Sequence, residues 1–295
     1  MNTNLRTPRV VLISGCSSGI GRAIAVDLVE HGYRVLAGVR LDADAESLDA
    51  LGYAELRPVR LDVTSDDSVN RLLGEVDAWH PQGIDALVNN AGVGLPSAVE
   101  LTTPEEFRDL LEVNTVGPLR LIRSCLPRLR KREGRIVNIT SLNGTVALPM
   151  IGAYSATKHA LEAMSDTLRV ELRPWGVIVV SVAPGQVLTP VFDKARVAIN
   201  DRRKAIPATL RPGYGSLYRR ALKYNERGAR ASTSAEDVAK VVRIALTAKR
   251  PRPRYHVGAD SFGVRLLKKV APTFLFDRVI ARLAGVFHRI KSHTE

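Results

Sequence analysis

Three residues in the middle of the chain have side chains that could together transfer a proton to or from a substrate oxygen. Tyr154 and Lys158 are four residues apart in AYSATKHALEAM, so on a helix they lie on one face, a turn apart. Two ordinary residues on a helix surface would have the same spacing. Ser141 lies 13 residues before Tyr154, at the end of the predicted strand RIVNITS. Ligands of doubly wound sheets bind at the carboxyl ends of the strands, so Ser141 favours a catalytic site.

A glycine-rich stretch, SGCSSGIGR at residues 14–22, lies between a predicted strand and a predicted helix. Gly15 permits a tight turn, Gly19 lets the backbone approach a pyrophosphate, and Gly21 lets the helix pack closely on the strand. The first N–H groups of that helix would face the anion. The spacing is Gly-x3-Gly-x-Gly, unlike the commoner fingerprint, and a purely structural turn is the alternative. Cys16, within the loop, is predicted to be a small buried side chain.

The end of the second predicted strand indicates which dinucleotide would bind. NAD-binding sites normally place a carboxylate there, to accept hydrogen bonds from the adenosine ribose. This chain has LAGVR, with Arg40 and no acidic residue at that point. A guanidinium there can pair with the 2′-phosphate of NADP, although a surface arginine without a partner is the alternative. Asp62, which closes the third predicted strand, could reach the adenine amino group, or could serve only as a turn or helix-capping residue.

These residues need a scaffold, and apolar runs that alternate with helical patterns predict one. The candidate strands contain Val, Ile and Leu without strict alternation, as expected for strands buried on both faces. They cover residues 10–14, 34–39, 56–63, 85–90, 135–140, 177–183 and 255–258, and helices are expected near 20–31, 67–79, 104–130, 153–173 and 235–248. The pattern predicts an α/β fold with a Rossmann-type, doubly wound parallel sheet. Thr233 and Glu236 could form a capping box.

Length and composition favour one large domain. The chain has 295 residues, of which 45% are hydrophobic, and no internal stretch resembles a linker. The N-terminus lacks the features of a secretory signal, and no apolar run is long enough to span a membrane. Two cysteines suggest neither a disulfide framework nor a metal site. A reducing, cytoplasmic location is therefore expected.

The positive charge is concentrated in the last third of the chain. The formal net charge is +13, yet residues 1–190 hold 19 Lys and Arg against 22 Asp and Glu, and residues 191–295 hold 24 against 8. Residues 191–232 are polar and basic, with Pro207, Pro212 and Gly213. We expect an irregular insertion there that acts as a substrate lid. Such a charge could serve an anionic membrane, nucleic acid or an acidic substrate, or form a solvated surface.

Residues 259–295 are predicted to form a basic, amphipathic helical extension of a catalytic domain at residues 1–258. Four apolar residues recur at helical spacing: Phe276, Ile280, Leu283 and Phe287. The cations among them are Arg265, Lys268, Lys269, Arg278, Arg282 and Arg289. The stripe could give a peripheral membrane contact, or it could pack on the protein itself or on a second subunit. Nucleic-acid binding is not favoured, because no aromatic-interleaved basic motif is present.

Taken together, these motifs resemble the short-chain dehydrogenase/reductase family. SGCSSGIG, NNAG at 89–92, Asn114, Ser141, Tyr154-x3-Lys158 and VAPGQV at 182–187 occur in the family's order and spacing, across roughly residues 9–190. Ser14 stands where the family usually has threonine, and it keeps a hydroxyl group. The resemblance implies that Tyr154 is the general acid in carbonyl reduction and the base in alcohol oxidation. A tyrosine with a pKa of ~10 needs a nearby cation for this work, and Lys158 would supply it.

The resemblance also assigns the other site residues. Ser141 would hydrogen-bond the substrate oxygen, and Asn114 would hold a water that links Lys158 to solvent, although a buried amide that satisfies backbone is the alternative. Asn89 would bond backbone in the central sheet. The residues expected to bind NADP are Gly15, Ser17, Ser18, Gly19, Ile20, Gly21, Arg40, Asp62, Val63, Asn90, Ala91, Gly92, Tyr154, Lys158, Pro184, Gly185, Val187 and Thr189.

Within the family, LAGVR, YSATK and the long tail look most like the hydroxysteroid and retinol dehydrogenase branch. That likeness implies a hydrophobic alcohol or ketone, such as a steroid, retinoid or lipid, and a homodimer or homotetramer that uses helices near 104–130 and 153–173. A non-catalytic NADP-binding regulator or membrane-associated binding protein on the same fold is the rival hypothesis. Such a protein would be expected to have lost Tyr154 or Lys158, and this chain keeps both.

Overall fold

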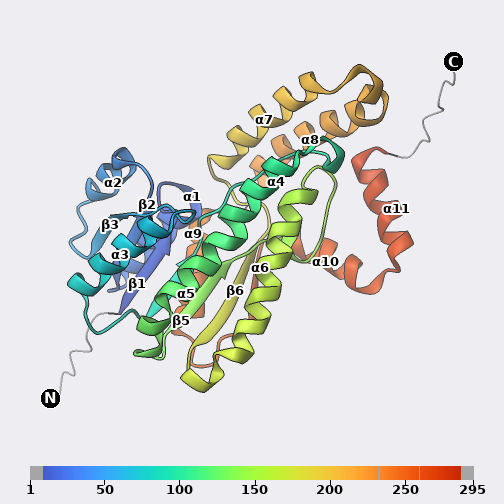
Figure 1. The fold of residues 1–295 in the computed structure, drawn as a ribbon. Helices are drawn as coiled ribbons and strands as arrows, with labels where there is room; N and C mark the ends of the chain where they lie inside the picture. The colour runs from blue at the N-terminus through green and yellow to red at the C-terminus, as the bar shows by residue number, and fades with distance from the viewer. Residues whose placement is uncertain (1–8, 232, 259, 287–295) are drawn as a thin grey trace.

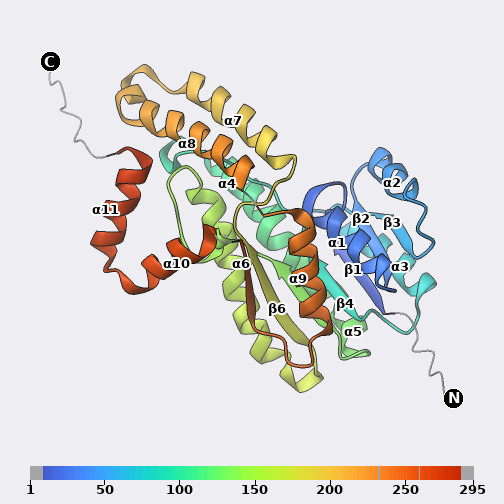
Figure 2. The same ribbon diagram turned by 180° about the vertical axis from the view of Figure 1, so that it is seen from behind.

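In the computed structural model, a seven-stranded parallel sheet lies between two layers of helices (Figures 1 and 2), and residues 9–231, 233–258 and 260–286 are described. The strand order is β3-β2-β1-β4-β5-β6-β7. The strands are β1 (Val10–Ser14), β2 (Arg34–Val39), β3 (Leu56–Arg60), β4 (Ala86–Asn89), β5 (Arg135–Ile139), β6 (Ile178–Pro184) and β7 (Arg254–Val257). This arrangement confirms the predicted Rossmann-type fold.

Helices cover both faces of the sheet, which explains the unbroken apolar strands. The helices of the main body are α1 (Gly19–Glu30), α2 (Asp42–Asp49), α3 (Asp66–Trp79), α4 (Pro104–Leu111), α5 (Gly117–Arg130), α6 (Gly152–Glu171) and α9 (Ala235–Thr247). Apolar residues of α1 and α9 share one core with one face of the sheet (Figure 2). Those of α3 and α5 share a second core with the other face, where α4 and α6 also lie (Figure 1).

Several predicted boundaries are wrong. The third strand ends at Arg60, before Asp62, and Ser141 lies two residues beyond the end of β5. The expected helix at 104–130 consists of α4 and α5, joined by a π-helical turn, η2 (Glu112–Val116). Asn114 lies in this turn. The helix α2, whose only buried residue is Leu48, was not predicted because a single buried position gives no apolar periodicity.

The expected irregular insertion at 191–232 is instead helical. It forms α7 (Val191–Ala205) and α8 (Arg211–Ala231), which lie side by side above α4 (Figures 1 and 2). Pro207 falls in the connection between them. Pro212 occupies the first turn of α8, where a missing N–H costs no hydrogen bond. The prolines therefore mark a helix boundary, and not the irregular structure that the sequence predicts.

The cap of α9, the last helix of the main body, differs from expectation. Ser234, and not Thr233, caps α9: its hydroxyl accepts a hydrogen bond from the Asp237 N–H at 3.0 Å. The Thr233 N–H instead donates to the Gln186 carbonyl at 3.0 Å. Beyond β7, the chain continues into α10 (Asp260–Val270) and α11 (Thr273–Ala284), which form an arm beside α8 (Figure 1).

Candidate functional site

The parallel strands place the predicted site residues along one edge of the sheet. The loops that follow β1, β2, β3, β4, β5 and β6 all leave from the carboxyl ends of their strands. Neighbouring loops touch: an ideal Cβ built at Gly19 lies 2.9 Å from the Thr189 methyl carbon, and one at Gly15 lies 2.8 Å from the Ala91 Cα atom. The first, fourth and sixth loops thus form a continuous surface.

The glycine loop is built around close contacts that side chains would block. Gly15 has φ +74° and Gly19 has φ +55°, a region that glycine adopts without strain. At Gly21, a Cβ would lie 2.1 Å from the Gly15 carbonyl oxygen. The Asn90 side-chain amide donates to the carbonyls of Ser14 and Gly15 at 3.0 and 2.9 Å. These hydrogen bonds fix the conformation of the loop from the side of the protein body. The other side of the loop faces the carboxyl ends of the strands.

The N-terminus of α1 suits an anion. Its cap residue, Ser18, has an exposed side chain that makes no capping hydrogen bond, and the first turn contains no acidic residue. The N–H groups of such a turn carry the positive end of the helix dipole. Cys16 is fully buried, and burial raises the pKa of its thiol well above the ordinary value. It is a packing residue, in agreement with the sequence analysis.

The residues expected to bind the adenosine half of the dinucleotide lie just after the carboxyl ends of β2 and β3. Arg40 is exposed directly after β2, and its charge contributes to a lowered pKa of Asp62. The main cause of that lowering is the pair of hydrogen bonds that Asp62 accepts from the Thr64 N–H and hydroxyl, at 2.9 and 2.7 Å. Asp62 thus forms a turn. The acidic residue nearest to Arg40 along the chain, Asp42, forms an ion pair with Arg60 at 3.2 Å.

The three residues singled out first lie together. Tyr154 is partly buried, and burial raises its pKa, whereas a hydrogen bond from the Ser141 hydroxyl lowers it. The Ser141 oxygen also accepts the Asn143 N–H at 3.1 Å, which fixes its position. Lys158 is 4% exposed, and its Nζ lies 5.9 Å from the centre of the Tyr154 ring. Burial lowers the pKa of Lys158 to about 8.

Asn114 holds the loop after β4 against α6. Its side-chain oxygen accepts the Val93 N–H at 2.8 Å, and its amide donates to the Val93 carbonyl and the Thr157 hydroxyl at 2.9 and 3.1 Å. The side chain is therefore a buried amide that satisfies backbone, the alternative named above. The residue four positions on, Pro118, has no N–H, so the Asn114 carbonyl lacks the donor that an α-helix would provide.

The remaining predicted residues line the same edge. Gly92 lies beside Asn114 and Lys158, since a Cβ there would be 3.3 Å from the Asn114 side-chain oxygen and 3.6 Å from Lys158 Nζ. Pro184, the last residue of β6, is buried. After it, the Gly185 N–H donates to the Val257 carbonyl at 2.8 Å, and Val187 forms a bridge with Thr233. Ser17 and Ile20 lie in the glycine loop and the start of α1, and Val63 packs under Gly117.

One sequence expectation about the sheet is wrong. Asn89 does not bond backbone: its amide donates to the Asn138 side-chain oxygen on β5 at 2.8 Å. Asn138 in turn donates to the Ser165 hydroxyl of α6 at 2.8 Å. Sequence reasoning also missed Asn143 and Thr157, which hold Ser141 and Asn114 in place. Each lies within three residues of a predicted site residue, and that proximity was the only available signal.

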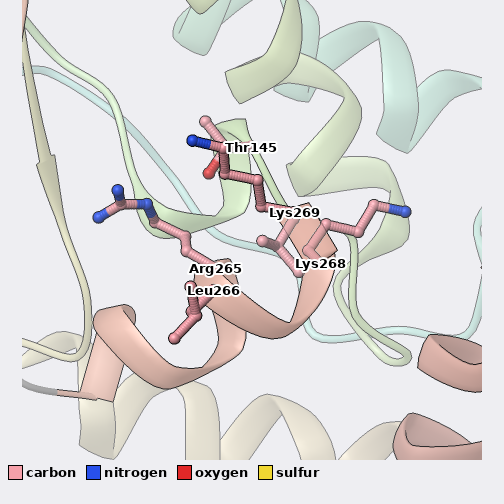
Figure 3. A pocket seen from close by; sticks show the side chains of 6 residues that line it. Thr145, Arg265, Leu266, Lys268 and Lys269 are labelled. Carbon is pink, nitrogen blue, oxygen red and sulfur yellow. The ribbon is translucent and has the colours of Figure 1, made fainter. Parts of the chain in front are cut away.

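The outer side of the site is bordered by α7, α8, α10 and α11. Arg202 ties α7 to the segment after β4, through the Ser97 hydroxyl at 2.9 Å and an ion pair with Glu106. Buried Phe276 of α11 packs against Leu142 and Val146, just after Ser141. Between this segment and α10 lies a cavity of about 390 Å³ (Figure 3), where Lys269 turns toward Thr145 while Arg265 and Lys268 point outward in opposite directions.

Comparisons with known proteins agree with this geometry. The model of the short chain dehydrogenase family matches residues 9–200. Retinol dehydrogenase 16 of Homo sapiens is 35% identical over 283 residues, which cover 92% of this chain and 87% of that protein. Mitochondrial D-beta-hydroxybutyrate dehydrogenase of Rattus norvegicus is 35% identical over 261 residues, covering 84% and 76%.

A solved structure shows the same fold with a dinucleotide bound. The short chain dehydrogenase from Burkholderia cenocepacia in complex with NADP has a TM-score of 0.71 and 26% identity, and the match covers 92% of this chain and 97% of that one. The residues described above fit such a ligand: a glycine cradle, a helix N-terminus without acidic residues, and a hydroxyl-rich far end. The chain belongs to the short-chain dehydrogenase/reductase family of oxidoreductases, with a resemblance to the retinol dehydrogenase branch.

Proposed function

We propose that the protein is an NADP(H)-dependent oxidoreductase that interconverts an apolar alcohol and its ketone or aldehyde. The observation that carries the proposal is the position of the Ser141 hydroxyl beside the Tyr154 phenol, with the Lys158 ammonium buried one helical turn away. A phenol, a hydroxyl and a cation at one point can hold a carbonyl oxygen and give it a proton.

Each of these residues would act on a different part of the reaction. When bound, the nicotinamide supplies the hydride for reduction or accepts it in oxidation. Ser141 holds the substrate oxygen, and Tyr154 donates a proton to it as negative charge develops. Burial raises the Tyr154 pKa and so keeps its hydroxyl protonated at neutral pH, which suits the reductive direction. The charge of Lys158 stabilises the phenolate left behind, and its Nζ would hold the nicotinamide ribose.

Asn114 would act through its main chain. Its side chain is occupied by Val93 and Thr157, whereas its carbonyl lacks the α-helical donor because of Pro118. We assign the proposed water that links Lys158 to solvent to this carbonyl.

Arg40 supports NADP over NAD. It is exposed at the end of β2, close enough to Asp62 to affect its pKa, where it can pair with a 2′-phosphate. Asp42, the first acidic residue after β2, is paired with Arg60 and so is not free to accept ribose hydrogen bonds. Asp62 would meet the adenine while it keeps its turn.

Apolar side chains at the open side of the site support an apolar substrate. Val93, Leu188 and Val191 are 40%, 56% and 59% exposed. Val93 and Leu188 lie on the loops after β4 and β6, and Val191 begins α7. Large apolar side chains exposed beside a polar centre are typical of a binding surface. We propose that α7 and α8 form a lid over a steroid, retinoid or lipid-like substrate.

The experiment that tests this function is a screen of the purified protein with NADPH or NADH against apolar ketones and aldehydes, retinal and long-chain ketones among them. We expect oxidation of NADPH, at a faster rate than that of NADH, with at least one apolar carbonyl compound. No oxidation of either coenzyme across the panel, from a protein that binds NADPH, would favour the rival hypothesis of a non-catalytic binding protein.

We also propose that α10 and α11 touch an anionic membrane surface from the cytoplasm. In the part of the chain that the structure describes, no helix is long and apolar enough to cross a bilayer. The predicted stripe is divided: Phe276 is buried and Ile280 packs beside it, Leu283 is exposed, and Phe287 and Arg289 lie outside the described residues. Val270, Phe274 and Leu283 are each 68% exposed.

Exposed cations accompany these apolar residues: Lys268, Lys269, Arg278 and Arg282. A K268E/K269E/R278E variant should therefore lose most of its binding to phosphatidylserine-containing vesicles, and added salt should weaken the wild-type protein in the same way. The matched control, K194E/R203E/K204E on α7, changes the net charge equally and should still bind. Equal binding by both variants, or none by the wild-type protein, would contradict this proposal.

The homodimer or homotetramer implied by the family stays a prediction for this chain. Val116, Leu119 and Val170 leave apolar surface exposed on η2, α5 and α6, where the contact is expected. Light scattering of the purified protein measures the state directly.

A further inference from the structure

A buried carboxylate lies one helical turn beyond Lys158, and the mechanism above does not use it. Glu162 is on the same face of α6 and is 4% exposed. Its Oε2 atom accepts hydrogen bonds from Ser181 Oγ at 2.9 Å and from Arg254 Nε and Nη2 at 2.9 and 2.6 Å. Its Oε1 atom is also buried and has no hydrogen-bond partner among the described residues.

The arginine reaches this carboxylate from the last strand of the sheet. Asn89, Asn138, Ser181 and Arg254 occupy one row across β4, β5, β6 and β7, since each is in register with the next. Because equivalent positions of neighbouring strands face the same side, the row lies under α6. Buried ion pairs are costly to desolvate and often contribute little net stability. Because packing alone does not explain the Glu162–Arg254 ion pair, we expect the pair to have a second role, through its effect on the neighbouring Lys158.

The electrostatics of Lys158 provide that role. Its Nζ donates to the Ile139 carbonyl at 3.0 Å, a neutral acceptor. Burial lowers the pKa of Lys158 to about 8, and the charge of Glu162 opposes that lowering. In a poorly solvated site, an anion one turn away acts on an ammonium more strongly than it would in water.

The other charged groups around the pair do not replace Glu162. Asp166, the next acidic residue of α6, is more than half exposed and bonds Arg254 and Arg169. His256, two residues beyond Arg254, has its pKa lowered to about 4, first by burial and then by Arg265 and Arg254, so it is neutral near pH 7. Tyr154 is neutral there as well. Among the described residues, Glu162 is the charge that supports the ammonium form of Lys158.

We propose that Glu162 is a positioning residue that holds Lys158 in its charged form, and that Arg254 limits the strength of this effect. The ion pair between β7 and α6 thereby sets the upper end of the pH range in which the site works. This inference rests on the proposed role of Lys158 in catalysis. Neither Glu162 nor Arg254 touches the reacting atoms in this scheme, and each acts through the lysine.

The test is an NMR titration of the full-length protein labelled with [¹³Cε]lysine, with the Lys158 signal assigned by its absence in Lys158→Met. In Glu162→Gln, we expect the Lys158 titration midpoint to fall by about one pH unit, because a nearby anion is lost. In Arg254→Met, the midpoint should rise, because Glu162 is no longer neutralised. For any carbonyl compound that the wild-type protein reduces, the alkaline limb of kcat/KM should move in the same two directions.

The opposite shifts of the Lys158 titration midpoint in Glu162→Gln and Arg254→Met distinguish this role from a purely structural one. A residue that only packs α6 onto the sheet would lower activity in both variants without moving the midpoint in opposite directions. If Arg254→Met does not fold, the double variant E162Q/R254M removes both charges, and its Lys158 midpoint must still fall below that of the wild-type protein. Asp166→Asn should leave the midpoint unchanged.

Unchanged midpoints in Glu162→Gln and in the double variant would overturn the proposal. The NMR titration needs no substrate, so it stays informative if the screen finds none. If the substrate screen finds no activity but the Lys158 midpoints shift as expected, the result would contradict the proposed function and leave the role of Glu162 supported.

Discussion

Replacing Tyr154 with phenylalanine should reduce the kcat of NADPH-dependent carbonyl reduction by about 10³-fold or more, the scale of effect expected for an essential general acid. Only the hydroxyl is lost, and the ring that packs near Lys158 remains, so the dissociation constant for NADPH should change little. Stopped-flow turnover and fluorescence titration with NADPH measure the two quantities separately. The combination is expected because, in the proposed mechanism, the hydroxyl meets the substrate oxygen, whereas the glycine loop and Lys158 hold the coenzyme.

The matched control is Tyr53→Phe, which removes another hydroxyl, one bonded to Glu30 at 2.6 Å on the far edge of the sheet. Its kcat should be that of the wild-type protein. Full activity in Tyr154→Phe would remove the tyrosine from the mechanism. Loss of NADPH binding in the same variant would mean that Tyr154 supports the site and not the chemistry.

Substituting Arg40 with aspartate should shift the ratio of kcat/KM for NADPH over NADH toward NADH by about 10- to 100-fold. The change removes a charge-assisted contact to the 2′-phosphate and introduces a carboxylate that repels it. The same carboxylate can accept hydrogen bonds from the two ribose hydroxyls of NADH. Initial rates with each coenzyme, measured on the same carbonyl substrate, give the ratio.

The control for this substitution is Arg57→Asp, on the neighbouring strand β3, where the arginine is exposed and pairs loosely with Glu75 at 3.8 Å. It makes the same change in net charge away from the carboxyl edge and should leave the coenzyme ratio unchanged. An unaltered ratio in Arg40→Asp would exclude Arg40 from the coenzyme site and leave the preference without a residue to explain it.

The sequence predicted the sheet and the placement of its loops well, because strands buried on both faces produce apolar runs that are hard to mistake. It could not predict which residues of different loops touch one another around the site. That Thr189 meets Gly19, and that Gly92 lies between Asn114 and Lys158, follows only from the crossover topology. The role of Asn90 as a brace for the glycine loop has no local signal.

The errors have identifiable physical causes. Polar, proline-containing residues at 191–232 suggested an irregular loop, yet the prolines occupy a connection and a first turn, where helices tolerate them. The side chain of Asn114 had two readings from the sequence, and the π-helical turn that presents it to Val93 decided between them. The Glu162–Arg254 pair was invisible because its members are 92 residues apart and meet only through the register of β6 and β7.

The most direct test of the account is deuterium transfer from [4,4-²H₂]NADPH, labelled at both C4 positions, to an apolar ketone from the screen, followed by mass spectrometry of the alcohol product. The account predicts that the wild-type protein places deuterium on the carbinol carbon and that Tyr154→Phe, with NADPH still bound, does not form the labelled alcohol at a measurable rate. A product without deuterium, or labelled product formed equally fast by Tyr154→Phe, would contradict a hydride-transfer site built on Tyr154.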